Sequence, residues 1–155
     1  METVFEMSDI DYPYGVLHDQ KLNSVRCEDN NFIFSFDIEL FKDDYDDEEF
    51  YEKYKNFKHC DMVVELNNEP FNYFELVTCI NTKGKFKGLS LNRKNFIDVI
   101  NNVTSATFVL CSATYSEFKI ELCVYFDKKG KYKKYAKYDM CNITLDAKKV
   151  IWNYY

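Results

Sequence analysis

The chain has 155 residues, of which 46% are hydrophobic and 18% aromatic, and its formal net charge is −6. A disordered chain lacks the apolar surface that offsets the entropy of ordering, so the composition excludes disorder and predicts one folded domain over residues 1–155. The pI near 5.0 argues against direct nucleic-acid binding, because a dedicated nucleic-acid-binding domain is usually basic. No apolar run is long enough for a membrane-spanning helix.

The charge is divided unevenly along the chain. The first 80 residues contain 20 of the 26 acidic residues and six of the 20 Lys and Arg, so they carry −14, and the remaining 75 carry +8. A field of this size steers association and rejects surfaces of like charge. The asymmetry favours a binding protein over an enzyme, and no catalytic motif accompanies it.

The first predicted element is a β-hairpin. Apolar and polar residues alternate from Phe32 to Leu40, as in a strand with one buried face. The segment from Gln20 to Cys27 precedes it, and the intervening Asp and Asn residues at 29–31 tolerate a tight turn.

A helix is predicted next, over Asp46–Lys58, because Phe50, Tyr54 and Phe57 recur at helical spacing behind an acidic first turn. Strands follow at Asp61–Leu66 and Tyr73–Ile80. A second helix, Arg93–Asn102, begins after Asn92, a residue type that caps helix N-termini.

A second hairpin has the clearest alternation in the chain. It pairs Thr107–Tyr115 with Glu117–Phe126, and less regular strands are predicted at 132–138, 142–145 and 150–154. The expected fold is therefore an α+β domain with a curved, mainly antiparallel sheet of five or more strands and one or two short helices. The predicted inner face includes these residues: Phe34, Phe36, Ile120, Leu122 and Val124.

The six cysteines, at positions 27, 60, 79, 111, 123 and 141, have irregular spacing. The N-terminus has neither the basic region nor the apolar stretch of an export signal, so we expect a cytoplasmic protein with free thiols. Cys111 and Cys123 fall within strand patterns, where a thiol usually fills space in the core.

The acidic run from Asp43 to Glu49 admits three interpretations. It lacks the Gly and the alternate ligands of an EF-hand loop, which leaves a metal site as the weakest. A solvated helix N-terminus and a surface for a basic partner remain open. For the partner surface the candidate residues are Asp43, Asp44, Tyr45, Asp46, Asp47, Glu48, Glu49, Tyr51 and Tyr54.

His18 and His59 are the only histidines, and each has an aspartate nearby. Adjacent residues on a strand face opposite sides, so we expect no catalytic dyad, metal site or cofactor there.

Lysines are concentrated at positions 83, 85 and 87 and from 128 to 137, and those of the second group alternate with Tyr132, Tyr135 and Tyr138. This pattern can bind single-stranded nucleic acid, but an edge strand protected by lysines explains it better.

Two segments carry a resemblance. The stretch Gly15-Val16-Leu17-His18-Asp19-Gln20-Lys21-Leu22 opens the first hairpin, and Cys141–Leu145 with Val150–Trp152 would form closing strands. Together they resemble small bacterial proteins with a Leu-His-Asp entry into a hairpin, many of them immunity proteins of polymorphic toxins. The resemblance covers about a third of the chain and implies a cytoplasmic, non-catalytic, partner-binding domain.

The leading hypothesis is therefore an inhibitor that binds a basic protein, with immunity against a toxin as its most specific form. A phage or mobile-element inhibitor of a nucleic-acid-guided nuclease, an anti-CRISPR-like mimic of nucleic acid, would use the same acidic surface. A small enzyme is the third class, and a pocket that gathers His18, His59 or Cys60 with a perturbed carboxylate would distinguish it.

Overall fold

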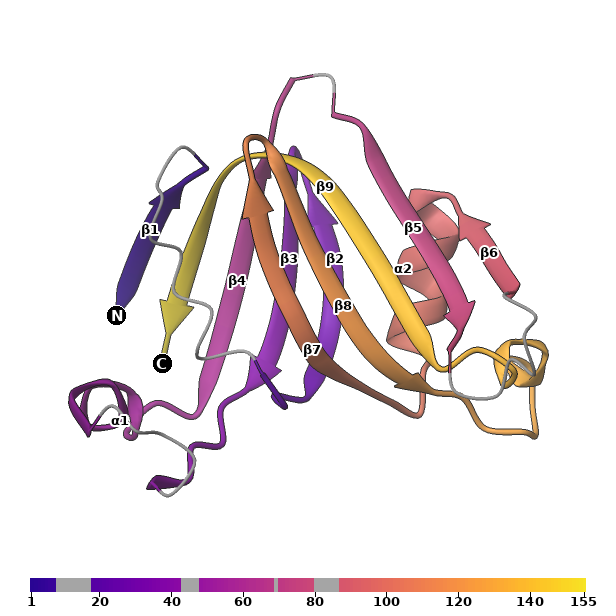
Figure 1. Ribbon diagram of the computed structural model, residues 1–155, viewed down its shortest axis with the longest axis horizontal. Coiled ribbons are helices and arrows are strands. Elements are labelled where there is room, and N and C mark those ends of the chain that lie inside the picture. The colour runs from indigo at the N-terminus through magenta and orange to yellow at the C-terminus, as the bar shows by residue number, and fades with distance from the viewer. Residues whose placement is uncertain (8–17, 43–47, 69, 80–86) are drawn as a thin grey trace.

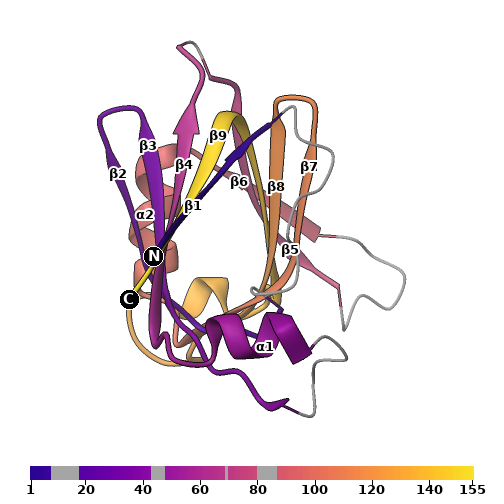
Figure 2. The same ribbon diagram turned by 90° about the vertical axis from the view of Figure 1, so that its left-hand side faces the viewer.

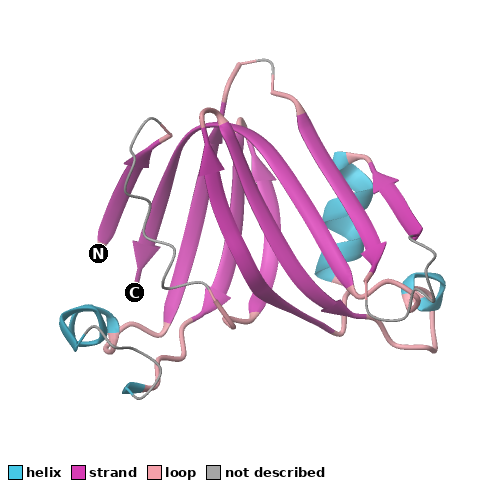
Figure 3. Cartoon of the chain, viewed as in Figure 1, coloured by secondary structure: helices cyan, strands magenta, loops and turns pink. Residues whose placement is uncertain are grey.

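The computed structural model describes residues 1–7, 18–42, 48–68, 70–79 and 87–155. In this part of the chain, nine strands form one strongly curled half-barrel sheet, accompanied by two α-helices (Figures 1 and 3). The predicted α+β fold with a curved antiparallel sheet is confirmed. Neither helix has the length and apolarity that crossing a membrane requires, as far as the described residues go.

The elements are as follows: β1 (Glu2–Glu6), β2 (Leu22–Glu28), β3 (Asn31–Asp37), α1 (Glu48–Tyr54), β4 (His59–Leu66), β5 (Asn72–Thr78), β6 (Lys87–Leu91), α2 (Arg93–Asn101), β7 (Ser105–Thr114), β8 (Glu117–Tyr125), the 3₁₀ turn η3 (Lys133–Tyr135) and β9 (Met140–Tyr154). The pairings among these strands are antiparallel.

Strand β9 is the strand with the most partners in the sheet, because it pairs with four others. Its first half pairs with β5 and β8, and its second half pairs with β4 and β1. Both Ala147 and Val150 are buried, so the alternation of buried and exposed residues changes phase between them, opposite a register shift at Glu65 and Leu66 in β4. Such a bulge bends a strand. One continuous strand therefore replaces the two that were predicted at 142–145 and 150–154.

The sheet curls until the residues just before β2 meet β7. Backbone hydrogen bonds join Asp19 N to Phe108 O at 2.9 Å and Phe108 N to Gln20 O at 3.0 Å. Helix α2 packs beside β2 (Figure 2) and β5 (Figure 1), and the ring of Phe96 stacks on Phe74 of β5 with centroids 4.3 Å apart. The strand curl and α2 together enclose one hydrophobic core.

The alternation in the sequence placed the core correctly. The five residues expected on the inner face have at most 4% exposure. Phe36 lies at the centre, with its ring 5.3 Å from Phe108 and 6.3 Å from Trp152.

Several predicted elements were wrong or had other bounds. The expected strand at 132–138 is instead a loop containing η3, because Tyr132, Tyr135 and Tyr138 recur every three residues and turn toward the body of the protein. Helix α1 ends at Tyr54 rather than Lys58. The short strands β1 and β6 were not predicted. Asp46, Asp47 and Ile80, at the edges of predicted elements, lie outside the described residues.

Candidate protein interface

Helix α1 is fixed to the sheet by its last residue. Tyr54 is only 4% exposed, and its ring lies 4.9 Å from Tyr154 and 4.7 Å from Phe50. The helix carries Glu48 and Glu49 in its first turn, and both are exposed. The buried tyrosine therefore holds an exposed acidic turn in a defined place.

The predicted partner-binding residues divide into three groups. Asp43, Asp44, Tyr45, Asp46 and Asp47 lie outside the described residues. Glu48, Glu49 and the half-buried Tyr51 are accessible on α1. Tyr54 belongs to the core, so it is not part of the candidate surface. The helical spacing of Phe50, Tyr54 and Phe57 marks the buried face of the helix, and Tyr54 is on that face.

Part of the negative charge on α1 is locally balanced. Lys42 Nζ lies 3.0 Å from Glu48 Oε1, and Lys55 pairs with Glu52. Glu49 is the acidic residue of α1 outside these two pairs, and it sits beside the run of four aspartates at 43–47 in the sequence. Most of the acidic charge in this part of the sequence therefore belongs to that run, which lies outside the described residues.

A pocket of about 490 Å³ lies next to α1 and was not foreseen. Its volume is within the range of ligand and side-chain pockets in proteins. Phe41 at its edge is 62% exposed. The lining residues are Asp37, Ile38, Glu39, Leu40, Phe41, Lys55, Lys58 and His59.

The pocket contains a side-chain hydrogen bond between neighbouring strands. His59 Nδ1 lies 2.5 Å from Asp37 Oδ1, and the two residues are partners in the register of β3 and β4. Side chains that lie opposite each other on paired strands are neighbours on the same face of the sheet. The contact between His59 and Asp37 could therefore be predicted only once the register of β3 and β4 was known.

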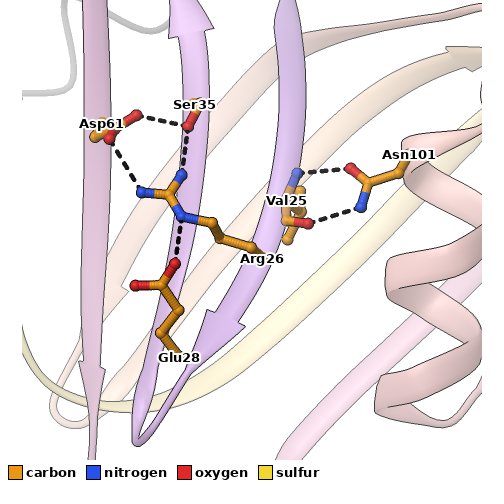
Figure 4. A network of polar contacts seen from close by, with 6 residues as sticks. All are labelled: Val25, Arg26, Glu28, Ser35, Asp61 and Asn101. Atoms are coloured by element: carbon orange, nitrogen blue, oxygen red, sulfur yellow. Dashed lines mark hydrogen bonds and ion pairs between the residues drawn. The ribbon is translucent and has the colours of Figure 1, made fainter.

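A polar network supports the sheet face beside this pocket (Figure 4). Arg26 donates hydrogen bonds to Glu28 Oε1 at 2.8 Å, to Ser35 Oγ at 2.9 Å and to Asp61 Oδ2 at 3.2 Å. Burial raises the pKa of Tyr155, and the neighbouring Asp61 carboxylate raises it further. The network ties β2, β3 and β4 together on their outer side.

The candidate catalytic and metal residues are not gathered into one site. His59 is exposed on the outer face of β4, whereas Cys60 is fully buried, and burial raises the pKa of its thiol. His18 contacts Asp19 at 2.8 Å, contrary to the expectation for neighbours on a strand, because Asp19 has a φ of 67° in a turn. In the described ranges, no group of three or more His, Cys, Asp or Glu could hold a metal ion.

The lysine-rich segment lies at the other end of the molecule. The longest axis runs from α1 and the N-terminus at one end to η3 and β6 at the other (Figure 1). The acidic first turn of α1 and the lysine-rich turn around η3 therefore lie far apart.

Comparison with known proteins adds no relative. No model of a protein family matches the chain, and the searches of curated proteins and of solved structures find no significant similarity. The resemblance to immunity-type proteins stays a prediction, and the geometry of the chain is what the functional argument rests on.

Proposed function

We propose that this protein is a non-catalytic inhibitor that binds a basic protein, most specifically an immunity protein that neutralises a toxin acting on nucleic acid. The observation that carries the proposal is the uneven charge along the sequence, −14 over the first 80 residues against +8 over the rest. The exposed acidic first turn of α1 and the lysine-rich turn lie at opposite ends of the longest axis (Figure 1). A nuclease binds phosphates through basic residues, so an acidic surface is attracted to its active site and can block it.

The pocket beside α1 supports the same function. Interface energy concentrates in a few anchors that fill pockets, with charged groups around them. Here the exposed ring of Phe41 and the carboxylates of Asp37 and Glu39 border one opening. The ring of Phe41 would offer an arginine or lysine of a basic partner an aromatic face. Lys55 and Lys58 line the same opening as the two carboxylates, so the ring, and not the charge of the pocket, would act as the anchor.

The test compares two variants of equal charge. Asp43, Asp44, Asp46 and Asp47 are changed together to Asn in one variant. Four acidic residues away from α1 are changed in the other: Glu75→Gln, Glu117→Gln, Glu121→Gln and Asp127→Asn. Each protein and the wild type are used to capture partners from the native host, and the captured protein is assayed for nuclease or other toxic activity.

We expect the wild type and the control variant to capture and inhibit the same basic protein. The variant at 43–47 should associate with it at least about tenfold more slowly and with a weaker dependence on salt, since exposed charges act mainly on the encounter rate. Equal association rates for both variants, or a captured protein whose activity is unaffected, would contradict the proposal.

A further inference from the structure

Residues 127–139, which lie between β8 and β9 and are hereafter called the lysine loop, carry a net positive charge from six lysines against Asp127 and Asp139. Six of its residues are lysines within the ten positions 128–137, and all six are exposed: Lys128, Lys129, Lys131, Lys133, Lys134 and Lys137. None of the ion pairs between described residues includes one of them. Like charges this close repel one another, so an anion at this surface would relieve the repulsion.

The backbone of the lysine loop is held firmly by its other side chains. The Tyr132 hydroxyl donates to Asp98 of α2 at 3.0 Å, and the Tyr135 ring lies 5.7 Å from Phe126. Thr78 Oγ1 donates to the carbonyl oxygen of Lys137 at 2.7 Å. The Nζ atoms of Lys131 and Lys134 lie 5.1 and 5.0 Å from the ring centroids of the tyrosines that follow them. The backbone that carries the lysines is therefore held in place, which lowers the entropic cost of binding a ligand with several of them at once.

The orientation of the tyrosines decides which anion fits. Tyr138 is buried and Tyr132 and Tyr135 are half-buried, so the surface of the loop offers ammonium groups with little aromatic or apolar area. Single-stranded nucleic acid is bound by stacking bases on exposed rings, interfacial membrane binding uses apolar residues, and protein hot spots favour Trp, Tyr and Arg. The phosphate backbone of a duplex needs only positive charge.

We propose that the lysine loop binds the phosphate backbone of double-stranded nucleic acid without sequence preference. The low pI does not oppose this, because it sums the charges of the whole chain. Charges separated by more than about 8–10 Å in physiological salt are largely screened from one another. This function is additional to inhibition of a protein partner and does not depend on it.

The test measures fluorescence anisotropy of two labelled DNA duplexes of unrelated sequence as the protein is added. We expect equal affinities for the two, which fall on the order of 100-fold between about 50 and 200 mM salt if four phosphates are contacted. Changing Lys128, Lys129, Lys133 and Lys134 together to Gln should weaken binding more than about tenfold and reduce the salt dependence by about one counterion per lysine.

The matched control removes four lysines from the opposite end: Lys42→Gln, Lys53→Gln, Lys55→Gln and Lys58→Gln. It changes the net charge equally and should bind the duplexes like the wild type. A second measurement needs no variant: the amide NMR signals of 128–137 should shift when duplex is added to the wild-type protein.

Three results would overturn the proposal: no duplex binding by the wild type at about 50 mM salt, equal losses in both variants, or binding to phosphatidylserine vesicles without binding to duplex. Because the experiment contains no protein partner, its failure leaves the inhibitor function untouched, and failure of the inhibitor test leaves this one untouched.

Discussion

The side-chain amide of Asn101 pairs with the backbone of Val25 as a neighbouring strand would. It accepts a hydrogen bond from Val25 N at 2.8 Å and donates one to Val25 O at 2.7 Å (Figure 4). Gln20 does the same for Glu39, whose N donates to the amide oxygen at 2.8 Å and whose O accepts from the amide nitrogen at 3.2 Å. The outer edge of β2 at Val25 and the backbone just after β3 at Glu39 thereby have hydrogen-bond partners without another strand.

Replacing Asn101 with Ala should lower the free energy of unfolding by about 1–2 kcal/mol, because both backbone groups of Val25 lose their partner. Urea unfolding measures the loss, and hydrogen exchange at the Val25 amide should accelerate. Asn95→Ala is the control, since Asn95 is exposed on the same helix. Equal effects of the two substitutions would mean that the amide pairing contributes no stability.

Tyr54 and Tyr51 should respond differently to truncation. Tyr54→Ala removes a buried ring and should cost about 3–4 kcal/mol of stability, whereas Tyr54→Phe should retain most of it. Tyr51→Ala, at a half-buried position, should cost less than about 1 kcal/mol and instead speed dissociation of the partner. A large loss of stability in Tyr51→Ala would place that ring in the core as well.

The cysteines should fall into a reactive and a protected class. All six are free thiols in the structure; Cys79 and Cys123 are exposed, whereas Cys60, Cys111 and Cys141 are buried. Burial raises the pKa of Cys141 to about 12. At neutral pH a thiol reagent should label Cys79 and Cys123 in the native protein and the three buried cysteines only after unfolding, as mass spectrometry of the labelled peptides can determine. Rapid labelling of Cys141 would indicate local opening of β9.

Glu65 should make stability depend on pH. A hydrogen bond from Lys149 lowers the pKa of its carboxyl, and a second from Lys148 adds to the effect. A lowered pKa means that the stabilisation is fully present above the ordinary value of about 4.3 and disappears as the pH falls through the lowered one. Glu65→Gln should therefore be less stable than the wild type at pH 7, by under about 1 kcal/mol at this partly exposed site, and equal to it near pH 2. An equal difference at both pH values would exclude the ion pairs as its cause.

Local patterns in the sequence predicted the strands that have one buried apolar face and one exposed polar face. The alternation around Phe34 and Leu122 required only that one face be buried, and both residues are in the core. Cys123 follows the same logic: as the neighbour of Leu122 it faces outward, so its expected role as a core filler was wrong. The alternation along a strand shows which side chains point into the core, whereas the type of a single residue does not.

Features that depend on partners distant in the sequence could not be predicted. The continuous β9 was divided in two because Lys148 and Lys149 interrupt its apolar pattern, and only the register with β4 shows that they form a bulge. The pocket at Asp37 and His59 likewise requires the pairing of β3 with β4. The predicted strand at 132–138 was wrong: its tyrosines recur every third residue, which suits the 3₁₀ turn found there, whereas a strand has a period of two.

The position of β9 in the chain has a consequence for how the protein folds. Four strands, β1, β4, β5 and β8, pair with it, yet it follows all of them in the sequence. During synthesis the hairpins β2–β3 and β7–β8 can form early, while one edge of each of these four strands waits for residues 140–154. Closure of the sheet is therefore a late and non-local event, which slows folding and leaves nascent chains exposed to aggregation until β9 leaves the ribosome.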